Sequence, residues 1–134
     1  MQISFDANIW ILGILDINPF CVKILINLSK FNVALPNQIR AEVERNLANK
    51  HVKQFYQFVL LSGARIDFET VPPSYIKSFE EKGLKKGDAE IGAFCEWRKV
   101  DIIVSNNRDF LRGLSPGHYF EVMSPQEFCE RFGL

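Results

Sequence analysis

The chain has 134 residues, 47% of them hydrophobic, and its 16 acidic side chains balance its 16 basic ones. We expect one domain over residues 1–134, because this length suits a single hydrophobic core and the composition excludes disordered, collagen-like and coiled-coil proteins. The zero net charge excludes a global field that would draw the chain to nucleic acid or an anionic membrane. Any contact with nucleic acid must therefore be local.

The location of the protein and the state of its thiols can be predicted next. The longest apolar run, residues 9–15, is too short to span a membrane, and no basic stretch precedes it as in a signal peptide. We therefore expect a cytoplasmic protein without membrane contact. Cys21, Cys95 and Cys129 are far apart and lie among apolar residues, which favours reduced core thiols over disulfides or a zinc site.

The first predicted strand ends at a carboxylate. Ile3 and Phe5 favour a strand that stops near Asp6, because aspartate is a poor strand residue. Ligands of open α/β sheets bind outside the carboxyl ends of the strands, so Asp6 is a candidate site residue. The alternative is an ordinary turn former or helix cap.

The next segment alternates helix and strand. Asn18 and Pro19 begin a predicted amphipathic helix, and residues 33–35 form a short strand candidate.

The second acid lies on a predicted helix that Asn37 can cap. Ile39, Glu42, Val43 and Asn46 recur at helical spacing, so all four should share an inward-facing stripe. An acid on an apolar stripe is costly unless it is paired or bound to a metal. Glu42 is therefore a candidate ligand, and the alternative is a boundary glutamate paired with an arginine.

The middle of the chain is predicted to connect these parts. Residues 51–61 favour a helix that Gly63 ends, and residues 65–71 form a possible strand. Pro72 and Pro73 predict an extended linker before Ser74 caps a short helix.

The third acid, Asp88, lies in the first turn of a strong predicted helix that runs to about Lys99. Lys85 and Lys86 precede it and can form part of a local basic rim. The alternative is an ordinary first-turn aspartate, which the helix dipole favours.

The final segment contains the clearest strand, residues 101–105, followed directly by the polar side chains of Asn107 and Asp109. Residues 119–123 predict a last strand, and Ser124 begins a capping box before a closing helix.

The alternation of strands and helices predicts a parallel sheet covered on both faces. In such a fold Asp6, Glu42 and Asp88 can meet at one edge of the sheet, joined by Asn107 and Asp109. Two carboxylates about 4 Å apart repel by roughly 4 kcal/mol at an effective dielectric constant near 20, so the cluster needs protons or cations. Oxygen ligands favour Mg²⁺ or Mn²⁺, and such a metal suits phosphodiester hydrolysis.

Four motifs carry a resemblance to a known family. They are Phe5-Asp6-Ala7-Asn8-Ile9, Leu35-Pro36-Asn37 with residues 39–47, Gly87-Asp88-Ala89-Glu90-Ile91, and residues 103–110, read as a strand followed by Ser-Asn-Asn-Arg-Asp-Phe. In this order they resemble the PIN domain family of metal-dependent ribonucleases, particularly small VapC-like toxins. The resemblance spans nearly the whole chain and implies a three-layer α/β/α sandwich with a central, mostly parallel, twisted sheet of four to five strands.

The resemblance also implies roles for individual residues. Asp6 and Asp88 would be the principal metal ligands, and Glu42 a ligand or a water-orienting group. The family's usual fourth acid falls on Asn107, a neutral auxiliary ligand that weakens a second metal site, although Asp109 could compensate. The residues expected around the ligands are Asn8, Asn46, Ser105 and Asp109, and those expected to contact RNA are Lys85, Lys86, Arg108 and Arg112.

The implied partners are an RNA substrate, an antitoxin protein and a second copy of the chain. Phe55, Tyr56 and Phe58 cannot all face inward on one helix, which is compatible with a homodimer interface. His51 and His118 are expected to be structural, because this chemistry needs no imidazole.

Three other functions can be compared with the sequence. A haloacid-dehalogenase-like phosphatase would need a second aspartate where Asn8 stands, and a dinucleotide-binding Rossmann protein would need a glycine-rich loop after a strand. The third is a PIN-like nucleic-acid or protein binding module that has lost catalysis, for which Asn107 is the motivating residue.

Overall fold

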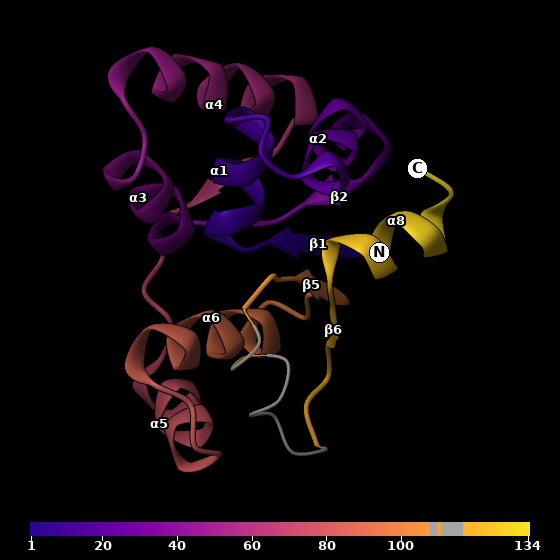
Figure 1. Cartoon of the computed structure of the whole chain (residues 1–134). Coiled ribbons are helices and arrows are strands. Elements are labelled where there is room, and N and C mark those ends of the chain that lie inside the picture. The colour runs from indigo at the N-terminus through magenta and orange to yellow at the C-terminus, as the bar shows by residue number, and fades with distance from the viewer. Residues whose placement is uncertain (108–109, 111–116) are drawn as a thin grey trace.

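A computed structural model describes residues 1–107, 110 and 117–134. Its central sheet has four parallel strands in the order β2-β1-β5-β6, as the alternation of elements predicts (Figure 1). The strands are β1 (Gln2–Phe5), β2 (Asn32–Val33), β5 (Ile102–Val104) and β6 (Glu121–Met123).

The helices lie on both sides of this sheet. They are α1 (Ala7–Ile14), α2 (Pro19–Ile26), the 3₁₀ helix η1 (Leu28–Lys30), α3 (Asn37–Arg45), α4 (Asn49–Ser62), α5 (Pro73–Glu81), α6 (Lys86–Trp97) and α8 (Pro125–Phe132). Figure 1 shows α1 to α4 above the sheet and α5 and α6 below it, so the architecture has three layers.

The register of the sheet brings the strand ends together. Phe5 pairs with Val104, and one residue further on the Asp6 amide donates to the Val104 carbonyl at 2.9 Å. The Ser105 amide in turn donates to the Met123 carbonyl at 2.9 Å. Asp6 and Ser105 therefore leave adjacent strands at the same edge of the sheet.

The core above the sheet is aromatic. Phe5 makes edge contacts with Trp10 on α1 and with Phe128 on α8, and Trp10 makes another with Phe55 on α4. All four rings are buried. Such edge-to-face pairs add to the stabilisation from buried area, so this cluster fixes α1, α4 and α8 on one face.

Several predicted boundaries are wrong. Residues 33–35 are not one strand: the chain leaves β2 at Val33 and begins β3 (Leu35–Pro36) in a separate sheet. There β3 pairs in parallel with β4 (Ile66–Asp67), which is all that forms of the strand predicted over 65–71.

The caps of α3 and α5 also differ from prediction. Pro36, not Asn37, is the N-cap of α3, and the Asn37 side-chain oxygen accepts from Arg40 Nε at 2.7 Å instead. Pro73 is helical rather than part of a linker, because its fixed φ suits the first turn of α5, and Ser74 lies inside the helix.

Other predicted signals are confirmed. Asn18 caps α2, Gly63 ends α4 with φ of +72°, and Ser124 forms the capping box of α8. Helix α6 ends at Trp97, slightly before the predicted Lys99.

The three cysteines are free and buried, as expected. Burial raises the pKa of the Cys21 thiol to about 12, so it is protonated at neutral pH.

Among the described helices, none alone has the length and hydrophobicity to cross a membrane; α1 and α2 reach that threshold only when taken together, across a bend of 96°.

Candidate active site

Asp6 lies where β1 ends and α1 begins, and only 7% of it is exposed. Its Oδ1 accepts from the Ala7 amide at 2.8 Å, and its Oδ2 accepts from the Ser105 hydroxyl at 3.0 Å. Burial raises the pKa of the Asp6 carboxyl, the two hydrogen bonds oppose this rise, and the charge of Asp88 adds to it. Asp6 is thus a helix cap and a member of an acidic group at once.

A chain of hydrogen bonds connects Asp6 with Asp88. The Ser105 oxygen accepts from the Asn107 amide at 3.0 Å, and Asn107 Nδ2 donates to both oxygens of Asp88, at 3.2 and 3.3 Å. The segment after β5 therefore joins an acid from β1 to an acid from the first turn of α6.

Glu42 completes the group from the second turn of α3. Ile39 and Val43 on the same stripe are fully buried, whereas Glu42 is half-buried. Burial contributes most to the raised pKa of the Glu42 carboxyl, and the charges of Asp6 and Asp88 raise it further, while Arg45 lowers it. The three carboxylates thus gather within electrostatic reach of one another. Among the described residues, Glu42 forms no ion pair with an arginine, which disfavours the alternative of a simple boundary pair.

The chemistry of these donors suits a hard divalent cation, because they are carboxylate and amide oxygens that repel one another without a counter-charge. Within the described residues, however, no three acidic, histidine or cysteine side chains already converge closely enough to hold a metal ion. Asn107 also points its nitrogen, not its oxygen, at Asp88. Ligation through the Asn107 oxygen would therefore require its amide to turn, whereas Asp6 is already held by two hydrogen bonds.

The remaining predicted site residues differ in placement. Asn46 is exposed at the C-cap of α3 rather than on the inward stripe, because the helix ends at Arg45, and its Nδ2 donates to the Glu42 carbonyl at 2.8 Å. Asn8 is also exposed, on the first turn of α1. Ser105 is buried against Asp6.

The predicted basic rim is only partly described. Lys85 and Lys86 are exposed at the start of α6, beside Asp88 in sequence. The predictions for Arg108, Asp109 and Arg112 lie outside the described residues.

The aromatic residues of α4 do not form the surface that the sequence suggested. Phe55 is fully buried, and Tyr56 and Phe58 pack against the core. The exposed apolar side chains of α4 are instead Leu60 and Leu61, at 81% and 72%. The three aromatics therefore provide no support for a homodimer.

One further contact at this edge had no sequence signal. Gln38 Nε2, in the first turn of α3, donates to the Gly87 carbonyl at the start of α6, at 3.2 Å. This bond holds the two acid-bearing helices together at their N-terminal ends.

The raised pKa values predict a pH dependence without metal. The pKa of Glu42 is higher in the folded protein than its ordinary value of 4.5, which holds in the unfolded chain. Its contribution to stability is therefore complete below pH 4.5 and is lost as the pH rises through the folded pKa. Glu42→Gln should therefore become more stable relative to wild type as the pH rises above about 4.5 in chelator. Thermal melts at stepped pH would measure this difference, and a difference that does not change with pH would contradict the prediction.

Comparison with known proteins rests on structure alone, since no family model and no curated protein matches the chain. A chain of the VapBC2 complex from Rickettsia felis, solved bound to a DNA fragment from their promoter, is similar with a TM-score of 0.66 and 23% identity, over 92% of this chain and 98% of that one. The chain has a VapC-like PIN fold. PAE2754 from Pyrobaculum aerophilum is similar with a TM-score of 0.66 at 15% identity, over 99% of this chain and 96% of that one. The PIN fold predicted from the four motifs is thus confirmed, and at these identities the likeness speaks for the fold alone.

Proposed function

We propose that this protein is a metal-dependent endoribonuclease that hydrolyses RNA phosphodiester bonds, and that it is the toxin of a VapBC-type toxin–antitoxin pair. The observation that carries the proposal is the gathering of Asp6, Glu42 and Asp88 at one sheet edge, where the charge of Asp88 raises the pKa of Asp6 and the charges of Asp6 and Asp88 raise the pKa of Glu42. The PIN fold supports it, because in open α/β sheets this edge is where ligands bind.

In this proposal the residues of the site have different roles. Asp6 and Asp88 would hold Mg²⁺ or Mn²⁺, Glu42 would bind the metal or orient the attacking water, and Asn107 would serve as an auxiliary ligand. The bound metal supplies a more acidic water and neutralises charge that develops on the phosphate. Ser105 fixes the Asp6 carboxylate through its hydroxyl, so that one ligand is preorganised before the metal arrives.

Further residues would support this group. The side chains proposed to surround it are Asn8, Asn46 and Asp109, and those proposed to contact the RNA backbone are Lys85, Lys86, Arg108 and Arg112. Exposed lysines next to an acidic site favour phosphate binding without making the whole protein basic.

The proposed partners are an antitoxin and a second copy of the chain. The similar chain from Rickettsia felis belongs to a VapBC2 complex, which supports an antitoxin for this chain as well. Co-purification with the product of an adjacent small gene would test the antitoxin. Sedimentation showing only monomer at high concentration would reject the homodimer.

The activity is tested by incubating purified protein with RNA in Mg²⁺, Mn²⁺ or chelator. The expected result is internal cleavage that needs the metal and that chelator stops. RNA binding without cleavage under every metal condition would reject the nuclease and favour the alternative, a PIN-like binding module, for which the neutral Asn107 is the observation in favour.

Asn107→Asp tests the role of the neutral amide. The change replaces a donor to Asp88 by a fourth carboxylate, so without metal the variant should lose about 1.5–3 kcal/mol of stability, the cost of breaking a hydrogen bond to a charged group. In Mg²⁺ the loss should shrink, because the added charge strengthens metal binding. Urea unfolding with and without Mg²⁺ measures both effects, and an equal loss in both conditions would separate Asn107 from the metal.

A further inference from the structure

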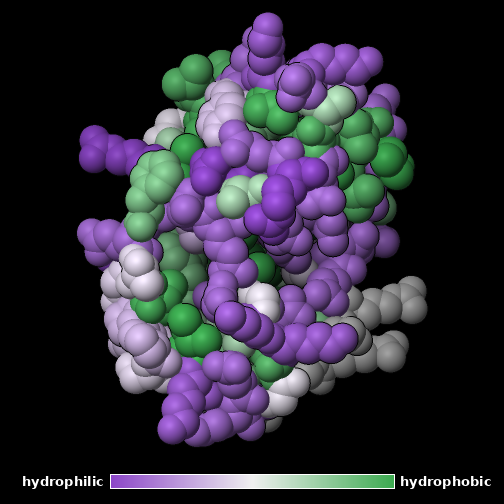
Figure 2. Space-filling model, turned by 90° about the vertical axis from the view of Figure 1, so that its left-hand side faces the viewer, coloured by the Kyte–Doolittle hydropathy of each residue, from purple (hydrophilic) through white to green (hydrophobic). Residues whose placement is uncertain are grey.

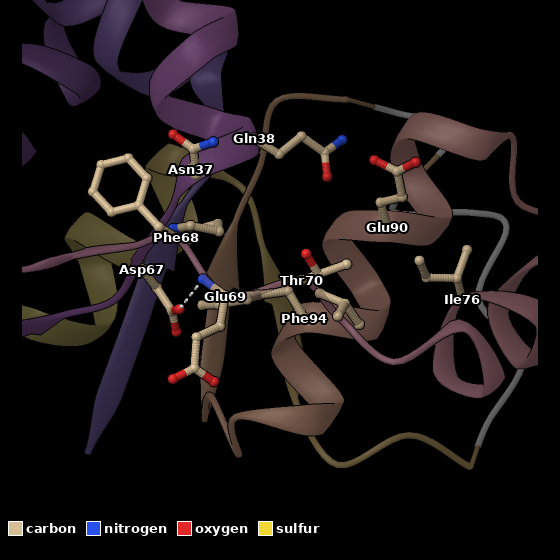
Figure 3. Close-up of a pocket in the computed structure, with 11 residues that line it drawn as sticks. Asn37, Gln38, Asp67, Phe68, Glu69, Thr70, Ile76, Glu90 and Phe94 are labelled. Carbon is tan, nitrogen blue, oxygen red and sulfur yellow. Dashed lines mark hydrogen bonds between the residues drawn. The ribbon is translucent and has the colours of Figure 1, made fainter.

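A pocket beside the acidic group has no role in the proposed hydrolysis. It has a volume of about 280 Å³ and lies between the start of α3, the segment after β4, and helices α5 and α6. Figure 3 shows Gln38 and Glu90 extending toward the same space from α3 and α6, with Thr70 and Phe94 below them. The pocket therefore combines an amide, a carboxylate and a hydroxyl over an aromatic floor.

The pocket and the acidic group are built on the same two helices, α3 and α6. Gln38 and Glu42 are four residues apart on α3, so they share a face of the helix about 6 Å apart along its axis. Asp88 and Glu90 are two residues apart near the start of α6, so their side chains leave the helix on different sides. The bond from Gln38 to the Gly87 carbonyl joins α3, which carries Glu42, to the start of α6, where Gly87 precedes Asp88. A nucleotide next to the scissile phosphate could therefore reach it.

The charges of the pocket leave one carboxylate available. Arg98 is bound to Asp67 at 2.8 Å and to Glu69 at 2.9 Å, which neutralises much of the charge at that end. Glu90 is half-buried as a residue, and within the described part of the chain its carboxylate has no hydrogen-bond or ion-pair partner. The carboxylate oxygens are not buried atoms, so they are open to hydrogen bonds from a ligand that offers donors.

The aromatic residues suit a flat ligand. Phe94 is 3% exposed in the pocket wall, whereas Phe68 is 67% exposed at the rim. Phe94 is too buried to present a ring face, so of these two rings only Phe68 offers a surface for stacking. Single-stranded RNA is recognised by stacking bases on exposed rings and by hydrogen bonds to the base edges. The volume lies just below the roughly 300–1,000 Å³ of pockets for drug-sized ligands, so it suits one base.

We infer that this pocket binds a guanine base of the RNA, in an inference that rests on the proposed nuclease function. Guanine is the base whose pairing edge offers two neighbouring donors, N1–H and the 2-amino group, to a carboxylate such as Glu90. Adenine places an acceptor, N1, at that position and would be repelled. The second N–H of the Gln38 amide can donate to guanine O6, since the first is used by Gly87.

The same surroundings could instead accept an arginine side chain of a protein partner. A position next to the acidic group and an exposed ring at the rim favour the base. Titration with a guanine nucleotide and with agmatine, an analogue of the arginine side chain, distinguishes the two ligands.

The test is an NMR titration of the ¹⁵N-labelled protein in chelator with GMP, IMP and AMP, which share the same phosphate. GMP should shift signals of the pocket residues, Thr70 and Phe94 among them. IMP lacks only the 2-amino group and should bind about tenfold more weakly, because one hydrogen bond to a charged group is lost. AMP should bind more weakly still.

Glu90→Gln should remove the preference for GMP over AMP, and Glu80→Gln is the matched control, because Glu80 is exposed on α5 and does not line the pocket. Equal binding of GMP and AMP, or shifts confined to other residues, would overturn the inference. Binding of agmatine in the pocket without binding of GMP would also overturn it and would identify a site for a basic protein segment. Because the titration needs neither metal nor cleavage, its failure is distinguishable from failure of the nuclease proposal, which is an absence of RNA cleavage with any metal.

Discussion

Replacing Asp6 with asparagine should lower the rate of metal-dependent RNA cleavage by about 10²- to 10³-fold, since a metal supplies several kcal/mol of charge stabilisation and each 1.4 kcal/mol is a factor of ten. Asp6 carries this effect because it is the most buried of the three acids and is held by two hydrogen bonds. Asparagine keeps the shape and can still accept from the Ala7 amide. It removes the charge and replaces Oδ2 by an NH2 group that donates to the Ser105 hydroxyl instead of accepting from it, so the cap of α1 should survive through Oδ1.

The matched control is Asp16→Asn, at the opposite end of α1. Asp16 is exposed and has φ of +56°, a conformation that asparagine adopts readily. Cleavage rates for both variants and wild type, measured over a range of Mg²⁺ concentrations, test the prediction. Equal rates for Asp6→Asn and wild type would show that the acidic group does not perform the chemistry, whatever the fold.

The three acids could be predicted from the sequence because each lies at a position with a local signal. Asp6 ends a strand, Glu42 interrupts an apolar helical stripe, and Asp88 begins a helix. Their meeting at one edge follows from parallel topology, which the alternation of elements predicts. Ser105 and Asn107 could be placed for the same reason, since they directly follow β5.

Other features had no local signal. Helix α1 is apolar on nearly every side because it is packed between other helices, so its sequence shows no periodicity to distinguish helix from strand. The pairing of β3 with β4 joins two segments of two residues each, too short for any pattern. Asn46 kept the helical spacing of the stripe, but α3 ends one residue earlier, and spacing alone cannot locate that end.

The pocket between Gln38 and Glu90 could not be predicted from the sequence either. Its polar groups come from three separate segments, and none of them interrupts a pattern in its own segment. Tertiary contacts, among them the bond from Gln38 on α3 to Gly87 at the start of α6, bring them together. The acidic group could be found from sequence because each member is locally unusual, and the pocket could not because each member is locally ordinary.

The surface of the molecule on the side of α3 and α6 is mostly polar. Figure 2 shows the face on the left of Figure 1, where hydrophilic residues dominate the centre and hydrophobic side chains are visible between them.

Trp10→Ala should have the largest effect on stability, a loss of about 3–5 kcal/mol in the free energy of unfolding, as for other large aromatic residues removed from a core. Trp10 is fully buried, makes edge contacts with Phe5 and Phe55, and donates its indole N–H to the Phe5 carbonyl at 3.2 Å. The change therefore creates a cavity between the sheet and α4. It also removes a hydrogen bond from the residue that precedes Asp6.

Trp10→Phe separates these two effects, because it keeps most of the ring contacts and loses the indole N–H. Urea unfolding should place its stability between those of wild type and Trp10→Ala. If the indole bond also positions Asp6, Trp10→Phe should slow RNA cleavage more than Phe128→Leu, which perturbs the ring cluster on α8 without touching the Phe5 carbonyl. Equal cleavage rates for these two variants would show that Trp10 stabilises the fold without positioning the acid, since both would then act only through the core.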